Sequence, residues 1–149
     1  MTWIQNLTEA LRFIEDNLTN DIGIEDISKQ ILTSGSNFQR VFNAVTGIPV
    51  SEYIRNRRLT MAGQELFHTN AKVTDIAMRY QYDTSESFSK AFQRFHEIPP
   101  SAAKKQGDKL KNYRPLAINV TIQGEFDSLI TVLWLANGHF CPSCEQTCP

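Results

Sequence analysis

Residues 36–48 read SNFQRVFNAVTGI and residues 86–98 read ESFSKAFQRFHEI, so one pattern occurs twice at an offset of fifty residues. The matched positions keep their apolar or basic character: Phe38 with Phe88, Arg40 with Lys90, Phe42 with Phe92, Ile48 with Ile98, and Pro49 with Pro99. A fixed offset of this kind predicts one structural unit that is used twice. Two copies are too few for a solenoid, so we interpret them as a pair of like modules that work together.

Helical spacing dominates the first 105 residues, which predicts an all-α domain. Phe38, Val41, Phe42 and Val45 stand at i, i+3, i+4 and i+7, the period of one buried helix face. The same period predicts helices over residues 2–18 and 36–45, a longer helix over residues 51–69 that Ser51 caps, and shorter helices around residues 24–32, 73–80 and 88–95. Each pair of short helices forms a helix-turn-helix unit, and the long helix connects the two units.

The phase of the second helix in each unit decides which side chains a partner can reach. With the Phe residues inward, the outward faces gather small or hydrogen-bonding side chains: Ser36, Asn37, Gln39, Arg40 and Asn43 in the first unit, and Ser85, Glu86, Ser87, Ser89 and Lys90 in the second. Such side chains reach base edges in a DNA major groove, where Arg40 suits guanine and Gln39 suits adenine. The competing interpretation is an ordinary solvated helix surface, and the repetition favours DNA binding.

The net charge of −1 hides an uneven distribution of charged residues. Residues 1–32 carry six acidic and two basic groups, and residues 115–149 carry three acidic groups and no basic one. Residues 33–114 carry thirteen basic and seven acidic groups, a net charge of +6, and they contain both units. Because local charge governs binding to a polyanion, the middle of the chain suits DNA phosphates.

Residues 5–104 resemble the DNA-binding domain of AraC/XylS-type transcription regulators. The resemblance is carried by IAMRYQYDTSESFSKAFQRFHEIPPS at 76–101, which is similar to the family signature around its second helix-turn-helix, and by ISKQILTSGSNFQRVFNAVTGIPVSEYIRNRRLTMAGQEL at 27–66. It implies seven helices, with two helix-turn-helix subdomains bridged by a long helix. It also implies sequence-specific binding of double-stranded DNA, with both recognition helices in successive major-groove segments about 34 Å apart.

By motif position, the resemblance implies base contacts from both recognition helices: Ser36, Gln39 and Arg40, then Ser85, Glu86, Ser89 and Lys90. Glu86 differs from the others, because its charge repels phosphates unless it accepts a hydrogen bond from a cytosine amino group. Arg55, Arg58 and Lys104 are candidates for phosphate contacts. Arg57 has an equal alternative, an ion pair with a neighbouring acid.

Three of the departures from the family pattern concern glycine. Leu32 and Gln81 stand in the turns where the family usually has glycine, and Glu97 replaces the glycine before the closing proline of the second unit. Where a turn requires a positive φ, a side chain introduces strain that glycine avoids. We therefore expect these positions to reduce stability or DNA affinity and to leave the fold unchanged.

The composition changes at Gln106, which divides the chain into a predicted DNA-binding domain at 1–105 and a linker with a short tail at 106–149. Apolar residues alternate with other types over 116–123, a period of two that predicts a strand. Some family members continue into a C-terminal effector-binding module with similar segments, which would make a small molecule a partner. Either the tail is a truncated module, or it packs onto the helices.

The end of the chain brings together four side chains of the types that bind zinc: His139, Cys141, Cys144 and Cys148. A structural zinc site normally collects its ligands from two separate turns, whereas these lie in one terminal stretch. Free thiols in a reducing cytoplasm are the alternative. We expect the thiols to be free, with neither a metal nor a cofactor.

Other classes of function fit the sequence less well. The sequence has no run of 18 or more apolar residues and no secretory signal pattern, so we expect no membrane partner and a cytoplasmic protein. His68, His96 and His139 form no pairing with a nucleophile or carboxylate in the sequence that suggests a catalytic set, so we expect no enzyme. We expect a regulator that contacts RNA polymerase. The alternative is a small-molecule-sensing or protein-interaction module with weakened DNA binding.

Overall fold

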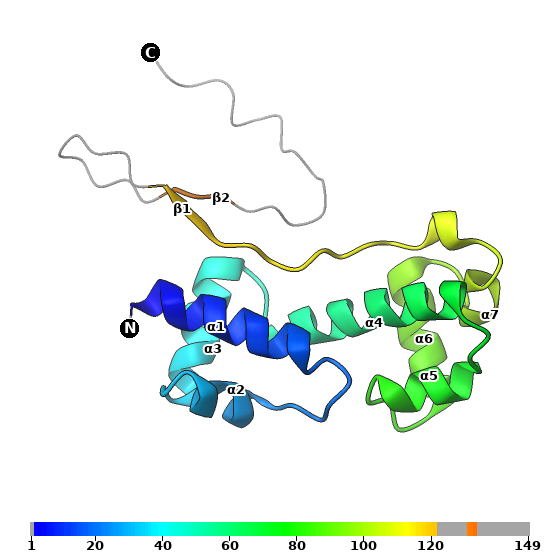
Figure 1. Ribbon diagram of the computed structural model, residues 1–149, viewed down its shortest axis with the longest axis horizontal. Helices are drawn as coiled ribbons and strands as arrows, with labels where there is room; N and C mark the ends of the chain where they lie inside the picture. Colours follow the sequence, from blue (N-terminus) through cyan, green and yellow to red (C-terminus); the bar gives the residue numbers. More distant parts are fainter. Residues whose placement is uncertain (1, 122–130, 134–149) are drawn as a thin grey trace, which may run out of the picture.

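The computed structural model describes residues 2–121 and 131–133, and its main elements are seven helices. They are α1 (Trp3–Asp16), α2 (Ile24–Gln30), α3 (Gly35–Thr46), α4 (Val50–His68), α5 (Val73–Arg79), α6 (Ser85–His96) and α7 (Pro100–Ala103). A 3₁₀ turn, η1 (Gly107–Lys109), follows, and β1 (Asn119–Thr121) pairs antiparallel with β2 (Thr131–Leu133). Helices α1 to α3 form one unit, α5 to α7 form the other, and α4 runs between them (Figure 1). The predicted all-α domain with seven helices is confirmed, and none of these described helices is long and apolar enough to cross a membrane.

The first unit is built around an apolar cluster from α1, α2, α3 and the start of α4. Leu11 and Ile14 face this cluster because they lie three residues apart, on one side of α1. Phe38 and Phe42 reach it from α3, with their ring centroids 5.6 Å apart. The predicted inward face of α3 is therefore confirmed.

The second unit repeats this arrangement around its own cluster. Phe88 and Phe92 of α6 take the corresponding places, with ring centroids 5.4 Å apart, and they pack with Leu66 of α4 and Ile76 of α5. Position by position, residues 41–50 and 91–100 have the same sequence of buried, half-buried and exposed side chains. The sequence repeat is thus also a repeat of structure.

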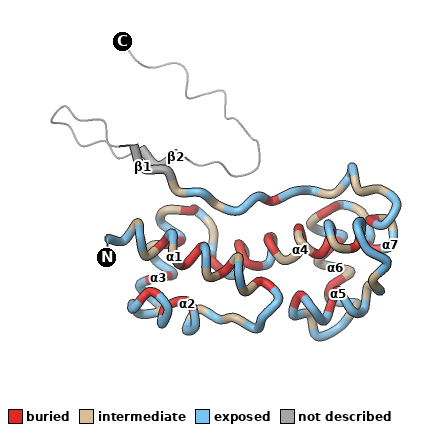
Figure 2. Tube along the Cα trace, viewed as in Figure 1, coloured by how far each residue is buried: buried red, intermediate tan, exposed pale blue. Residues whose placement is uncertain are grey.

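Helix α4 belongs to both clusters. Nine of its 19 residues are buried, and Figure 2 shows buried positions recurring along its length. Tyr53 and Ile54 face the first cluster, Leu59 and Leu66 face the second, and Met61 packs against both. At 1.5 Å per residue the helix is about 28 Å long, so its length sets the separation of the two units.

The start of α4 differs from the prediction. Pro49 occupies the N-cap position with φ −64°, and Val50 is the first helical residue, which leaves Ser51 exposed in the first turn. The predicted Ser51 cap is wrong, because the fixed φ of proline already directs the chain into the helix.

A buried ion pair ties α1 to α4. The Nε and Nη2 atoms of Arg57 lie 2.9 and 2.8 Å from the carboxylate oxygens of Glu15. The hydroxyl of Tyr53 donates to the same carboxylate at 2.7 Å, and burial together with this carboxylate raises the pKa of Tyr53 well above its usual range. Of the two interpretations of Arg57, the ion pair is the one that the structure shows.

Residues 110–118 run back along α4 and contact both clusters (Figure 1). Tyr113 is buried, and its backbone N donates to Oγ1 of Thr60 at 3.1 Å. Leu110 packs against the second cluster and Leu116 against the first. Of the two alternatives for the tail, this part packs onto the helices.

Little else of the tail is described. Of the segment predicted as a strand, residues 116–118 belong to no regular element, residues 119–121 form β1, and residues 122 and 123 lie outside the described range. The candidate zinc ligands also lie outside it: His139, Cys141, Cys144 and Cys148.

The turns contain the positive φ angles that the missing glycines suggested. Leu32 has φ 52° and Gln81 has φ 65°, each in the turn of its unit. Glu97 ends α6 with φ 65°, where Gly47 ends α3 with φ 70°. The second turn is one residue longer, since four residues separate α2 from α3 and five separate α5 from α6.

Candidate nucleic-acid interface

Helix α3 presents the polar face that the sequence predicted. Ser34 caps the helix, because its Oγ accepts a hydrogen bond from N of Asn37 at 3.3 Å. Ser36, Asn37, Gln39 and Arg40 are all exposed, since the phenylalanine side chains hold the opposite face of the helix in the core. The structure therefore brings all four first-unit candidates together on one helix surface.

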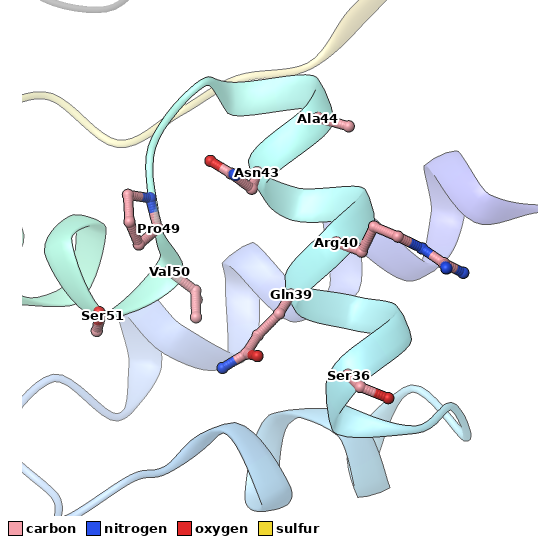
Figure 3. A pocket seen from close by; sticks show the side chains of 8 residues that line it. All are labelled: Ser36, Gln39, Arg40, Asn43, Ala44, Pro49, Val50 and Ser51. Atoms are coloured by element: carbon pink, nitrogen blue, oxygen red, sulfur yellow. The ribbon is translucent and has the colours of Figure 1, made fainter.

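An open groove of about 610 Å³ lies between α3 and the start of α4 (Figure 3). It is lined by Ser36, Gln39, Arg40, Asn43, Ala44, Pro49, Val50 and Ser51. Figure 3 shows that Gln39 and Asn43 point toward the start of α4, whereas Arg40 extends from the other side of α3. The Nη2 atom of Arg40 donates to Oδ1 of Asn37 at 3.1 Å, which holds the guanidinium along the helix. The side chains of Gln39 and Arg40 thus point to different parts of one surface.

Helix α6 presents its candidates less uniformly. Glu86 and Lys90 are exposed, whereas Ser85 and Ser89 are half-buried. The hydroxyl of Ser89 donates to the carbonyl of Ser85 at 2.7 Å, which leaves its oxygen as an acceptor for a partner. Within the described residues, Lys90 takes part in no salt bridge, so its ammonium remains available for an anion or a base.

The three candidates for phosphate contacts have different surroundings. Arg55 is exposed on α4, and no salt bridge within the described ranges involves it. Arg58 is half-buried and donates through Nε and Nη2 to two backbone carbonyls of the loop after α1, at 2.8 and 2.7 Å. Lys104 donates from Nζ to the carbonyl of Ala71 at 2.7 Å. Of these three, Arg55 is therefore the one whose donors are not already shared with a protein carbonyl among the described residues.

A second open pocket, of about 270 Å³, lies between the two units. It is lined by Ile22, Ser51, Ile54, Arg55, Arg58, Gln81 and Tyr82. Ser51 lines this pocket as well as the groove beside α3, and it stands one helical turn before Arg55. Burial raises the pKa of Tyr82, which keeps its hydroxyl a neutral donor. Neither Ser51 nor Tyr82 was among the sequence-predicted candidates, because serine at position 51 also suits a helix cap and Tyr82 lies in a predicted turn.

Comparison with known proteins identifies the family. A family model described as a helix-turn-helix domain matches residues 27–106. The HTH-type transcriptional activator AarP of Providencia stuartii is 43% identical over 95 residues, which cover 64% of this chain and 70% of AarP. The multiple antibiotic resistance protein MarA of Escherichia coli K12 is 31% identical over 90 residues, which cover 60% of this chain and 71% of MarA. The crystal structure of a transcriptional regulator with an AraC-type DNA-binding domain from Chromobacterium violaceum matches with a TM-score of 0.65 at 25% identity, over 69% of this chain and 92% of that one. The chain belongs to the AraC/XylS family, and it is a non-enzymatic, sequence-specific DNA-binding transcriptional regulator with two helix-turn-helix motifs.

Proposed function

We propose that this regulator binds one DNA duplex with α3 and α6 in adjacent major-groove segments. The observation that carries the proposal is that two helices with matching exposed and buried positions stand at opposite ends of α4 (Figure 1). The length of α4, about 28 Å, is close to the roughly 34 Å between successive major-groove segments on one face of DNA. One helix of this length gives the two units a spacing that suits a single duplex.

The base contacts of the first unit come from Gln39 and Arg40, with Ser36 and Asn37 beside them. Arginine forms two hydrogen bonds with O6 and N7 of guanine, and glutamine forms two with adenine. The exposure of both side chains and their different directions support contacts to different base pairs of one groove segment (Figure 3).

The base contacts of the second unit come from Lys90, Glu86 and the two half-buried serines, Ser85 and Ser89. Lys90 suits guanine, and Glu86 suits a cytosine amino group. Because the hydroxyl of Ser89 already donates to a protein carbonyl, it serves as an acceptor.

The phosphate contacts are centred on Arg55. This side chain lines the pocket between the two units, where the DNA backbone passes when both recognition helices occupy one face of the duplex. Arg58 and Lys104 add positive charge on the same domain, and their donors are partly taken by protein carbonyls. Phosphate contacts of this kind set orientation and give binding its dependence on salt.

Contact with RNA polymerase is part of the same proposal. A regulator without enzymatic activity changes transcription through the proteins that it touches, and AarP, at 43% identity, is named a transcriptional activator. The test is transcription in vitro from a promoter that carries the selected site, with the amount of bound polymerase measured in parallel. Stimulation with retained polymerase supports the contact, and transcription that never changes overturns it.

Selection from random duplexes tests the mode of DNA binding. The expected result is one enriched motif with two informative segments about one helical turn apart. A motif with a single informative segment contradicts binding through both helices. Binding that depends only on salt, with no enriched motif, overturns the proposal as a whole.

A further inference from the structure

Three consecutive backbone carbonyls in the loop after α1 receive hydrogen bonds from outside that loop. The carbonyls of Leu18 and Asn20 accept from Nε and Nη2 of Arg58, at 2.8 and 2.7 Å. The carbonyl between them, that of Thr19, accepts from Nε2 of Gln81 at 2.6 Å. We call these three hydrogen bonds the inter-unit bridge: the bond from Gln81 joins the turn of the second unit to Thr19 of the first, and the two bonds from Arg58 hold the same loop against α4.

The bridge explains a residue that the backbone alone disfavours. Gln81 has φ 65°, a conformation in which glycine avoids strain. Leu32 has the corresponding place in the first unit, also with positive φ, and its side chain is 93% exposed. The side chain of Gln81 instead spans to the other unit, so the strained position supplies a contact that glycine cannot make.

The bridge adds a further link between the units, besides α4, on a side away from residues 110–118. In Figure 1 the loop after α1 and the turn between α5 and α6 approach each other below α4, whereas residues 110–118 run above it. Two units joined only through α4 can rotate relative to each other when that helix bends or twists. The hydrogen bond between Gln81 and Thr19, which lie 62 positions apart in the sequence, opposes this rotation.

We propose that Gln81 and Arg58 are positioning residues that fix the separation and relative rotation of α3 and α6, so that the regulator selects DNA by the spacing between its two contacted segments. The inference rests on the proposed binding of one duplex by both helices. Inserting one base pair moves one segment by about 3.4 Å and rotates it by about 35° relative to the other. The bridge resists that change, and its removal should let the two units follow the change more readily.

The matched variants are Gln81→Ala and Leu32→Ala. Both shorten an exposed side chain to alanine at a residue with positive φ, and only the first removes a hydrogen bond of the bridge. Gln81→Lys is the rescue variant, because its ammonium can donate to the carbonyl of Thr19.

The first measurement needs no DNA. Spin labels at positions 44 and 94, exposed and fifty residues apart on α3 and α6, report the distance between the two helices. The three cysteines of the chain are replaced by serine for this purpose. The expected result is a narrow distribution of distances for the parent and for Leu32→Ala, and a broader one for Gln81→Ala. Equal widths for all three proteins overturn the inference.

The second measurement uses the duplex that the parent selects, together with duplexes one or two base pairs longer or shorter between its two segments. The parent and Leu32→Ala should lose at least about tenfold in affinity when one base pair is inserted, because the second segment then leaves its register. Gln81→Ala should lose less than about threefold in affinity on the same insertion. Gln81→Lys should again lose about as much affinity as the parent.

The two measurements separate the inference from the proposed function. If Gln81→Ala discriminates between spacings as strongly as the parent, the inference fails while binding through both helices stands. If even the parent tolerates every spacing because one segment alone carries the affinity, the proposed binding mode fails. A change in thermal stability with an unchanged spacing profile shows a merely structural role for Gln81 and also overturns the inference.

Discussion

Leu32 and Gln81 have corresponding places in the two turns, and both adopt the left-handed backbone conformation, with φ 52° and 65°. The amide of Gln81 donates to the carbonyl of Thr19 at 2.6 Å, whereas the side chain of Leu32 is 93% exposed. The strain at Leu32 therefore has no side-chain burial to offset it.

We expect Leu32→Gly to raise the free energy of unfolding by about 0.5–1 kcal/mol. Relief of the left-handed conformation contributes roughly 1–2 kcal/mol, and the greater freedom of glycine in the unfolded chain removes about 0.4–1 kcal/mol. Denaturation by urea measures the change. Leu32→Ala keeps the strained Cβ, so a gain as large as that of glycine would contradict this explanation.

The Glu15–Arg57 pair should be the ion pair with the largest effect on stability in the described structure. Glu15→Gln leaves the buried guanidinium of Arg57 without its partner charge and should lower the free energy of unfolding by about 2–3 kcal/mol, a value reduced because Glu15 is partly exposed. Glu9→Gln, which removes the exposed pair with Arg12, should change it by less than about 0.5 kcal/mol. Equal effects of the two changes in thermal or chemical denaturation would show that burial of Arg57 does not matter.

His96 makes stability depend on pH. Its Nε2 lies 2.9 Å from the carbonyl of Leu59, and its Nδ1 accepts from N of Lys111 at 3.1 Å, which fixes a neutral ring with the proton on Nε2. Burial lowers the pKa of His96 below its ordinary value of 6.5, the hydrogen bond to Leu59 opposes this, and the charge of Lys111 adds to it.

The unfolded chain therefore takes up the proton first as the pH falls. The contribution of neutral His96 to the free energy of unfolding is fully present above pH 6.5. It is lost as the pH falls from there toward the lower pKa that His96 has in the folded state. The drop in unfolding free energy between about pH 7.5 and about pH 5.5 should be smaller in His96→Gln than in the parent. His68→Gln, a change at an exposed histidine at the end of α4, is the control and should keep the parental drop. Identical pH profiles for all three proteins would rule out the role of His96.

Gly63 allows α4 and α6 to approach each other. A Cβ at this position would lie 2.9 Å from Nε2 of His96 and 3.2 Å from a methyl carbon of Leu110. Gly63→Ala should therefore lower the free energy of unfolding by about 1 kcal/mol, although alanine ordinarily stabilises a helix by a similar amount. The control is Gln64→Ala, at the next, exposed residue, which should change it by no more than about 0.5 kcal/mol. A Gly63→Ala variant that is more stable than the parent would show that the ring of His96 moves aside at no cost in stability.

The repeated helices could be predicted because their information is local. The spacing of Phe38, Phe42, Phe88 and Phe92 fixes which side of each helix is buried, and all four are buried as expected. The positive φ angles could also be anticipated locally, because three positions at which the family usually has glycine carry another residue in this chain.

Contacts between distant parts of the chain could not be predicted in the same way. The pairing of Arg57 with Glu15 joins residues 42 positions apart, and Tyr113 reaches Thr60 across 53 positions. The sequence predicted that Arg58 contacts phosphates, because a basic residue in a basic domain suits them. The structure shows that Arg58 donates hydrogen bonds to two backbone carbonyls. Which candidates touch bases remains a prediction, since a polar residue on an exposed helix face is equally compatible with solvent.

The most direct test of binding through both recognition helices compares Arg40→Ala and Lys90→Ala on single-base variants of the selected duplex. Each change should lower affinity for the parent site by about 1–3 kcal/mol and relax specificity at its own base positions, with the two sets of positions about one helical turn apart. If both changes relax the same positions, or if both weaken all sequences uniformly, α3 and α6 do not read two segments of one duplex.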